Sequence, residues 1–501
     1  MSDKPYADIT LLLEGTYPYV RGGVSGWVHQ IIQGLPQFTF SLVFLGAQSS
    51  DYEGLKYTLP SNVVHHESHY LWDETQKPKP KSCRGNSQYF LDFDKLHKWF
   101  REPSRGYDKA LAKQLLTSLG QKQGCTEAEF LYSEAAWEYL CASHRRFCPE
   151  GSFINYVWTI RAMHAALFKL AAIAHQLPAT GAYHSVSTGY AGFLGAILSN
   201  LSGRPLILTE HGIYTKERKI DLQSIFIEEH RDYLSDALDK GMKYYDQLWL
   251  RYFEGLGRLI YCNSNPIISL YERNRQRQIN DGADAARTQV IPNGMRLEQF
   301  TVLLNQRTEK IPPVIGLLGR IVPIKDIKTF IRAMRSIVSK LPNAEGWLIG
   351  PEEEDPAYVQ ECKSLVHNLG LEQNVRFLGF QNIGDILPHL GLLVLTSISE
   401  AFPLVILEAY ASGIPVVTTD VGGCREIIEG NTPEDKALGP AGIVVPIADP
   451  EATAKACIDL LSDEPRWHEA QRAGLNRVER FYTEEIVLSS YVKIYSEALA
   501  S

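Results

Sequence analysis

The stretch that most constrains the fold of this chain is TSISEAFPLVILEAYASGIPVV, residues 396–417. A short apolar run, LLVL, precedes it and predicts a strand. Pro403 suits the first turn of a helix, because its missing N–H would have no partner there, and Gly413 suits the helix end. We therefore predict the succession strand, loop, helix, turn and strand, which is the repeat of a parallel α/β sheet.

Two carboxylates stand eight residues apart in this stretch. Glu400 falls in the loop after the first strand, and Glu408 lies one to two turns into the helix, among apolar neighbours. A carboxylate in apolar surroundings needs a partner, and the free N–H groups at a helix start attract anions. Two solvated glutamates on a helix surface would show the same spacing, but the apolar context favours a ligand site.

The run SEAFPLVILEAYASGIPVV resembles the signature of glycosyltransferase family 4, the retaining GT-B enzymes that use nucleotide-sugar donors. Further similarity extends over about residues 7–45 and 183–482. The resemblance implies an α/β protein of the GT-B class, in which two Rossmann-like domains face a cleft. It also implies that the C-terminal helix crosses back onto the first domain.

We accordingly expect an acceptor-side domain over residues 1–304 and a nucleotide-sugar-binding domain over 305–482, with residues 483–501 as the helix that packs back. The βα alternation breaks down over about 68–154, where helical periodicity over 88–102, 107–121 and 127–147 predicts a helical insertion. The insertion contains Asp92-Phe93-Asp94, a string that binds manganese in other glycosyltransferases. Here it lies in a helical pattern whose i and i+2 side chains point apart, so we predict a solvated face.

Two cations follow the apolar strand VIGLLG of residues 314–319. Arg320 and Lys325 stand at the mouth of this strand, just before a predicted helix, where they suit a diphosphate. They can neutralise its charge without a metal, and the resemblance assigns them to the donor pyrophosphate. We therefore expect neither a metal nor a cofactor, since the nucleotide-sugar is a substrate.

The same resemblance assigns the remaining contacts of the donor. Glu408 would hold the ribose hydroxyls, and Glu400 would contact the 3- and 4-hydroxyls of the sugar. The amides of Leu404 and Val405 would bind the diphosphate at the helix start. The backbone around Leu378 and Phe380 would read the nucleobase.

Two features of the first half also follow predicted strands. Gly22 and Gly23 lie between the strand of residues 7–13 and a helix, a layout that lets backbone approach a ligand. Their spacing is not the dinucleotide fingerprint, and an ordinary tight turn is the alternative. His211 follows the strand of residues 206–209 within TEHG. The resemblance gives the glycines to donor phosphate and acceptor, and His211 to the transferred sugar.

Composition narrows the class of protein. The chain has 501 residues, 50 Lys and Arg against 58 Asp and Glu, and a net charge of −8, which argues against a nucleic-acid partner. Its eight cysteines form no C-x-x-C pair, so free thiols are expected. No segment reaches roughly 18 uncharged apolar residues, and the best candidate, residues 190–201, is short. We expect a cytoplasmic protein without a transmembrane segment of its own.

Two stretches refine the expected function. EGTYPYVRGGVSGWVHQ and TEHGIYTKER resemble a branch of the family that acts in bacterial exopolysaccharide synthesis with inner-membrane partners. The expectation is a metal-independent retaining hexosyltransferase that uses a UDP-sugar, UDP-glucose first, and a carbohydrate acceptor. The alternatives are a UDP-sugar 2-epimerase of the same fold, which needs no acceptor, and a non-catalytic nucleotide-sugar-binding component of a membrane assembly.

Overall fold

The structure is a computed structural model that describes residues 7–73, 78–216, 218 and 236–501. The chain divides into two compact units. Unit 1 comprises residues 1–269, 275–289 and 491–501, and unit 2 comprises residues 270–274 and 290–490. Residues 290–304, which the sequence analysis assigned to the first domain, thus belong to unit 2, since Phe300 and Leu303 are buried in its core.

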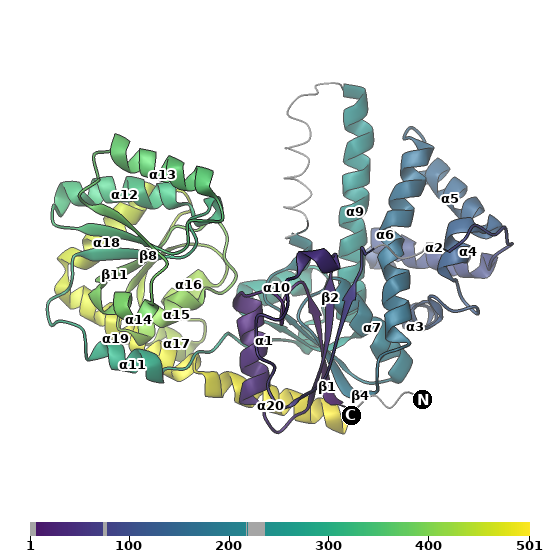
Figure 1. Ribbon diagram of the computed structural model, residues 1–501, viewed down its shortest axis with the longest axis horizontal. Helices are drawn as coiled ribbons and strands as arrows, with labels where there is room; N and C mark the ends of the chain where they lie inside the picture. Colours follow the sequence, from purple (N-terminus) through teal and green to yellow (C-terminus); the bar gives the residue numbers. More distant parts are fainter. Residues whose placement is uncertain (1–6, 74–77, 217, 219–235) are drawn as a thin grey trace. The chain divides into compact units, whose positions relative to one another are not determined.

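Unit 1 is built on a parallel sheet with the spatial order β3-β2-β1-β4-β5-β6-β7 (Figure 1). From β1 the chain moves outward to β3, returns to β4 and continues to the other edge. This is the Rossmann-like order, in which ligands bind at the carboxyl ends of the strands. The strands are β1 (Ala7–Glu14), β2 (Phe40–Gly46), β3 (Val63–Tyr70), β4 (Thr180–Ser185), β5 (Leu206–Glu210), β6 (Ser264–Ser269) and β7 (Thr288–Val290).

Helices pack on the sheet of unit 1 and include α1 (Gly23–Gly34), α6 (Phe153–Ala174), α7 (Tyr190–Ser202), α9 (Asp236–Asn263) and α10 (Glu272–Asn280). The sequence also predicts a strand over residues 258–263, and this prediction is wrong. Residues 258–263 form the end of α9, where Leu259 and Ile260 are buried against the core, and the strand is β6, one step later. A short apolar run fits a buried helix end as well as a strand.

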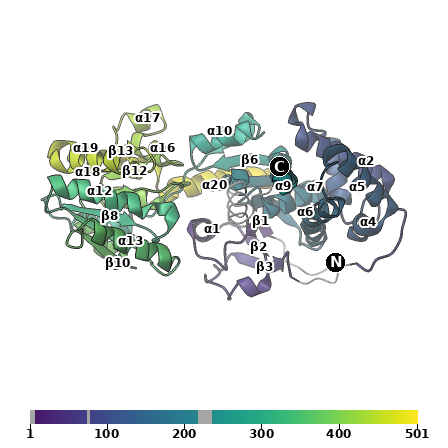
Figure 2. The ribbon, with the colours of Figure 1, turned by 90° about the horizontal axis from the view of Figure 1, so that it is seen from above.

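The predicted insertion is helical. It consists of α2 (Ser87–Arg101), α3 (Lys109–Ser118), α4 (Glu127–Tyr132) and α5 (Glu134–Phe147). Figure 2 shows α2, α4 and α5 beside α6. Ser133 separates α4 from α5, because its side chain caps the start of α5. Asp92 is buried and pairs with Lys95 at 2.8 Å. The predicted solvated face is therefore wrong for Asp92, although the residue is paired rather than poised for a metal.

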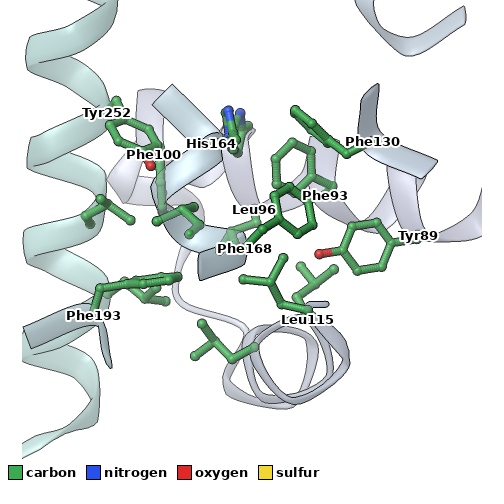
Figure 3. Close-up of a pocket in the computed structure, with 16 residues that line it drawn as sticks. Tyr89, Phe93, Leu96, Phe100, Leu115, Phe130, His164, Phe168, Phe193 and Tyr252 are labelled. Atoms are coloured by element: carbon green, nitrogen blue, oxygen red, sulfur yellow. The ribbon is translucent and has the colours of Figure 1, made fainter. Parts of the chain in front are cut away.

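Aromatic side chains fill the core of this insertion. Phe93, Phe130 and Phe168 surround a cavity of about 40 Å³, and His164 lies on its wall (Figure 3). Nδ1 of His164 donates to the carbonyl oxygen of Ile160 at 2.7 Å, and its Nε2 lies 3.5 Å from Nε2 of His97. The cavity holds little more than a water molecule, so it is a packing defect of an apolar core.

Among the described residues, α6 is the one helix long and apolar enough to span a membrane. The sequence analysis found no such segment, because it required an uncharged run and α6 contains Arg161 and Lys169. In the structure, 61% of its most apolar window is buried within the protein. A core helix of a folded protein passes the same test of length and composition.

Unit 2 also contains a parallel sheet, with the order β10-β9-β8-β11-β12-β13, which again is Rossmann-like. The strands are β8 (Val314–Leu318), β9 (Glu345–Ile349), β10 (Val375–Gly379), β11 (Leu392–Leu395), β12 (Val416–Thr419) and β13 (Gly442–Val445). One buried cluster contains residues of α12 (Ile327–Lys340), α13 (Pro356–Asn368) and α18 (Pro450–Ser462). The other contains residues of α11 (Glu298–Leu304), α15 (Leu404–Ala411) and α16 (Cys424–Glu429).

The chain ends in two long helices, α19 (Glu464–Phe481) and α20 (Glu484–Ala500). α19 packs in unit 2, where the guanidinium of Arg477 is fully buried against Asp435. The last residues of α20, from Tyr491 onward, belong to unit 1. Tyr491 and Tyr495 are both fully buried there.

Candidate functional site

The carboxyl ends of β8 and β11 in unit 2 carry two loops that are cross-linked to each other. The hydroxyl of Thr396 donates to the carbonyl oxygen of Lys325 at 2.9 Å, and the N–H of Ile398 donates to the carbonyl oxygen of Ile324 at 2.9 Å. These neutral hydrogen bonds fix the loop after β11 against the turn before α12. The side chains of Lys325 and Glu400 are thereby brought together.

The Glu400 carboxylate is held from two sides. Its Oε1 accepts a hydrogen bond from Nζ of Lys325 at 2.5 Å and another from the hydroxyl of Ser397 at 2.7 Å. Lys325 and Glu400 are largely buried, with 21% and 13% of their side chains exposed. Charge-assisted hydrogen bonds at this depth are stronger than surface ion pairs. Two residues that the sequence analysis predicted for different parts of the donor are thus joined in one cluster.

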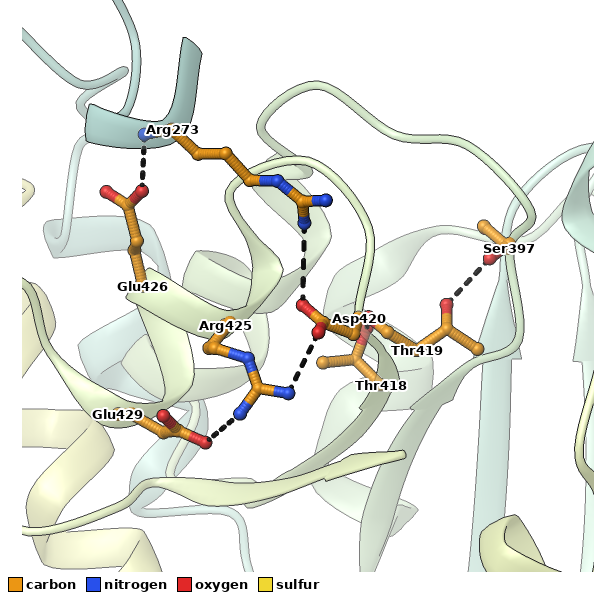
Figure 4. A network of polar contacts seen from close by, with 8 residues as sticks. All are labelled: Arg273, Ser397, Thr418, Thr419, Asp420, Arg425, Glu426 and Glu429. Carbon is orange, nitrogen blue, oxygen red and sulfur yellow. Dashed lines mark hydrogen bonds and ion pairs between the residues drawn. The ribbon is translucent and has the colours of Figure 1, made fainter. Parts of the chain in front are cut away.

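A second turn supports the Glu400 loop, and the sequence analysis missed its role (Figure 4). The hydroxyl of Thr419 donates to the carbonyl oxygen of Ser397 at 2.6 Å. A side chain at Gly422 would meet the carbonyl oxygens of Glu400 and Ala401 at 2.2 and 2.4 Å. Because Gly422 also has a left-handed φ of +52°, only glycine fits here. The Gly-Gly pair after β12 was the signal available in the sequence.

The predicted helix between the two glutamates is α15, with Pro403 as its N-cap and Ser412 as its C-cap. Leu404 and Val405 are its first two residues, so their N–H groups point out of the helix start. Burial raises the pKa of Glu408 to about 7. Within the described part of the chain no hydrogen bond or ion pair is found for this carboxylate, and a desolvated acid without a partner marks a ligand site.

Arg320 follows β8, but its guanidinium is engaged by an acid that the sequence analysis did not consider. Nη1 of Arg320 lies 2.6 and 2.7 Å from the two carboxylate oxygens of Glu354. Both side chains are about half exposed. Asp326, next to Lys325, has a left-handed φ of +45° and caps α12 through Thr329. Such backbone strain in a non-glycine residue is common at ligand sites.

The predicted nucleobase loop lies at the end of the edge strand β10. The carbonyl oxygen of Leu378 accepts a hydrogen bond from Nε2 of Gln381 at 2.7 Å, so one of its lone pairs is occupied. The side chain of Phe380 is 82% exposed. A large exposed aromatic ring can stack on a planar base, whereas the sequence analysis had considered only backbone contacts here.

The remaining predicted residues lie at the carboxyl ends of strands in unit 1. Gly22 is the N-cap of α1 and Gly23 its first residue, and a Cβ at either position would meet nothing within 4 Å. His211 follows β5 directly and is 7% exposed. Burial lowers the pKa of His211 to about 4, and its Nε2 has no hydrogen-bond partner. A neutral buried imidazole with an open nitrogen can bind a hydroxyl.

The structure thus gathers Lys325, Glu400 and Glu408 with the start of α15 in unit 2, and Gly22, Gly23 and His211 in unit 1. In the described residues no group of three or more His, Cys, Asp and Glu side chains could hold a metal ion. Two cations and the helix N–H groups suit an anion. The two carboxylates suit polyhydroxylated groups on either side of that anion.

Two family models match the chain, one in each half. Residues 7–286 match the model described as "Domain of unknown function (DUF3492)". The chain belongs to the DUF3492 family. Residues 312–463 of this DUF3492 member match the model "Glycosyl transferases group 1", so its second half places it among the group 1 glycosyltransferases.

Curated relatives of this DUF3492 member include several proteins named as glycosyltransferases. It is 34% identical over 178 residues to N-acetyl-alpha-D-glucosaminyl L-malate synthase of Bacillus anthracis. The matched segment covers 35% of this chain and 43% of the relative. It is 28% identical over 217 residues to the capsular polysaccharide biosynthesis glycosyltransferase CapM of Staphylococcus aureus. This match covers 41% of this chain and 53% of CapM. The chain spans about half the length of the curated relatives it matches.

Solved structures resemble the DUF3492 member over nearly its whole length. Anabaena HepE in complex with UDP and glucose has a TM-score of 0.57 and 16% identity, covering 98% of this chain and 99% of HepE. WaaG, a glycosyltransferase involved in lipopolysaccharide biosynthesis, has a TM-score of 0.51 and 12% identity. The match covers 97% of this chain and 99% of WaaG. The prediction of two Rossmann-like domains of the GT-B class is confirmed.

Proposed function

We propose that this DUF3492 member is a retaining hexosyltransferase that uses a UDP-sugar donor. The observation that carries the proposal is the Lys325–Glu400 pair in the loop that leads into α15, a helix that carries the desolvated Glu408 and begins with N–H groups that have no intrahelical partner. The group 1 match over residues 312–463 supports it, and so does the fold shared with HepE, which was solved with UDP and glucose.

In this proposal the diphosphate of the donor lies between Arg320, Lys325 and the N–H groups of Leu404 and Val405. These donors stabilise the negative charge that grows on the leaving UDP. The hydrogen bonds that link the two loops hold the backbone at Lys325 and in the Glu400 loop before the reaction. The side chains of Arg320 and Lys325 exchange Glu354 and Glu400 for the diphosphate. No metal is required for this step, because two cations and the helix start supply the compensating charge.

The two glutamates and His211 hold the sugars of the donor. Glu408 accepts hydrogen bonds from the ribose hydroxyls, and its raised pKa falls once these donors replace the apolar surroundings. Glu400 accepts from the 3- and 4-hydroxyls of the transferred hexose, while His211 binds another hydroxyl. Gly22 and Gly23 leave room for backbone contacts to phosphate and acceptor, and Phe380 and the backbone at Leu378 face the base.

The chemical step exchanges one bond at the anomeric carbon for another. The bond to the diphosphate oxygen breaks, and the acceptor hydroxyl attacks from the same face, so the configuration is retained. The hydroxyl proton leaves with the diphosphate oxygen. Exclusion of water around the site would limit hydrolysis of the donor.

We further propose that the hexose is glucose and that the product is a bacterial exopolysaccharide of the Pel type. The stretches EGTYPYVRGGVSGWVHQ and TEHGIYTKER support this assignment, together with CapM among the relatives. In such a system the chain works at the cytoplasmic side of the inner membrane, held there by partners of a membrane-embedded synthase.

Calorimetric titration with UDP tests the donor site. Wild-type protein is expected to bind UDP, and Arg320→Ala is expected to weaken binding by about tenfold, the loss of one charged hydrogen bond. The matched control is Arg332→Ala, an exposed arginine of α12, which should leave affinity unchanged. Equal UDP affinity in all three proteins would remove the assignment of Arg320.

Product analysis with a panel of UDP-sugars tests the reaction. Transfer of glucose with an α-linkage in the product, seen by proton NMR, is the expected result, and it should persist in EDTA. Conversion of a UDP-sugar to its 2-epimer without acceptor would identify the epimerase instead. Binding of UDP without any turnover would identify a nucleotide-sugar-binding component.

A further inference from the structure

An aromatic residue of α1 packs against His211. The ring of Trp27 lies 4.7 Å from the ring of His211 between centroids, at an interplanar angle of 70°. Trp27 is 4% exposed, and edge-to-face packing of this kind fixes the relative tilt of two rings. Since Nε2 of His211 has no hydrogen-bond partner, Trp27 is a principal restraint on where that nitrogen points.

Trp27 is itself held by the last residues of the chain. Its ring lies 5.4 Å from the ring of Tyr491, at 68°, and 5.9 Å from that of His184, at 90°. Tyr491 is 280 residues away from His211 in the sequence. The C-terminal part of α20 therefore reaches the residue assigned to the transferred sugar through a single intervening side chain.

A buried polar network fixes this second layer. The hydroxyl of Tyr491 lies 3.0 Å from Oγ1 of Thr209, which lies 2.9 Å from Nε2 of His184. Nδ1 of His184 lies 2.8 Å from the hydroxyl of Tyr495. All four side chains are fully buried. Thr209 is two residues before His211 on β5, so the network also anchors the strand that presents His211.

An apolar core alone would not need these groups. Phenylalanine would fill the volume of Tyr491 or Tyr495 equally well, and a buried histidine with two partners is costly if either partner is lost. A fully satisfied polar network specifies one arrangement of the side chains around it, whereas apolar contacts tolerate several. In this protein the network holds Tyr491, which packs against Trp27. Trp27 in turn packs against His211, whose Nε2 has no hydrogen-bond partner.

We propose that Trp27 and Tyr491 are positioning residues for His211, with Thr209, His184 and Tyr495 as the buried network that holds them. This inference rests on the proposed function, because it assumes that His211 binds the transferred sugar. It adds that the final helix of the chain is part of the machinery that aims His211, and that neither residue touches the substrate.

The test compares Trp27→Phe, Trp27→Leu and Tyr491→Phe with the control Tyr252→Phe. Tyr252 is also buried and loses one hydroxyl hydrogen bond, to the carbonyl oxygen of Met163 at 2.6 Å, but it lies in α9 and faces α6. Measured quantities are the melting temperature, the Kd for UDP, kcat and KM for the UDP-sugar, and the NMR titration of the His211 ring.

Tyr491→Phe and Trp27→Leu are expected to lower kcat by on the order of tenfold to a hundredfold, the cost of misplacing a contact group. Their Kd for UDP should match wild type. The melting temperature of Tyr491→Phe should fall no more than that of Tyr252→Phe, whereas Trp27→Leu should melt lower because it also opens a cavity. Trp27→Phe should keep more activity than Trp27→Leu, because a smaller aromatic ring still packs edge to face. The titration of His211 should move towards that of a free histidine in Trp27→Leu.

Unchanged kcat in Tyr491→Phe and Trp27→Leu, in a protein that His211→Ala inactivates, would overturn the inference. If His211→Ala remains fully active, the role of His211 in the proposed function is wrong, and the NMR titration then decides the positioning claim alone. An unchanged His211 titration in Trp27→Leu would overturn it. If the wild-type protein does not bind UDP, the proposed function is wrong, whatever the variants show.

Discussion

Nζ of Lys325 lies 2.5 Å from Oε1 of Glu400, so the cation assigned to the donor diphosphate is paired with the acid assigned to the donor sugar. A diphosphate would offer Lys325 a stronger partner and release the Glu400 carboxylate. Glu400 would then be free to accept hydrogen bonds from sugar hydroxyls. The pair thus links occupation of the phosphate position to availability of the acid.

Substitutions at this pair should separate binding from transfer. Lys325→Met should weaken UDP binding by about tenfold or more, because a charged hydrogen bond is worth roughly 1.5–3 kcal/mol. Glu400→Gln should bind UDP at least as tightly as wild type, since Lys325 is no longer neutralised, yet lose transfer. Calorimetry with UDP and a glucosyl-transfer assay check both. Lys328→Met, which removes the partner of the exposed Glu361, is the control, and equal UDP affinity in both lysine variants would contradict the assignment.

Glu354 competes with the diphosphate for Arg320. Their side chains are 55% and 51% exposed, so the pair contributes little to stability, about 0.2–1 kcal/mol. Glu354→Gln should therefore leave the melting temperature unchanged and tighten UDP binding by about two- to fivefold at low salt. The gain should vanish in high salt, where exposed charges are screened. A gain of the same size in Glu361→Gln would show that it reflects net charge alone.

The pKa of Glu408 makes UDP binding depend on pH. Burial raises the pKa of Glu408 to about 7, and ribose hydroxyls bind the ionised carboxylate better than the acid. Affinity for UDP should therefore rise by about tenfold between roughly pH 6 and pH 8, as the carboxylate ionises. Glu408→Gln should bind UDP more weakly at the upper pH and lose the Glu408 part of this dependence. A pH profile unchanged by that substitution would place the ribose elsewhere.

The secondary structure around the candidate donor site could be predicted largely from the sequence because its parts are local. Residues 396–417 contain the strand, the glutamates, the helix start and the glycine that ends the helix, and the structure has α15 within the predicted bounds. The sequence also placed Arg320 and Lys325 after β8. What joins these pieces, the hydroxyl of Thr396 on the turn at Lys325, follows from the strand order of the sheet.

The parts that could not be predicted depend on contacts between distant residues. Glu354 faces Arg320 across 34 residues, and nothing in its acidic run distinguishes it from its neighbours. Tyr491 meets Thr209 across 282 residues, in a helix that reads simply as amphipathic. The strand wrongly placed at residues 258–263 failed for another reason: a short apolar run carries no period long enough to separate a helix end from a strand.

Buried histidines in unit 1 should make it sensitive to acid. Burial lowers the pKa of His164 to about 4 and that of His97 well below its ordinary value of 6.5. A folded-state pKa below the unfolded value means that the unfolded chain takes up protons first. Their contribution to stability is complete above the unfolded pKa of about 6.5 and is lost progressively as pH falls towards 4.

For His164 alone the free energy of unfolding falls by about 2 kcal/mol by roughly pH 5. This corresponds to a fall in melting temperature of about 4–8 °C for a domain of this size. His164→Leu should remove that share of the acid sensitivity, so its melting temperature should fall less than that of wild type between about pH 7 and pH 5. His175→Leu, at an exposed histidine that caps α6, should keep the wild-type slope. Parallel melting curves against pH for wild type and His164→Leu would show that His164 is not buried as a neutral imidazole.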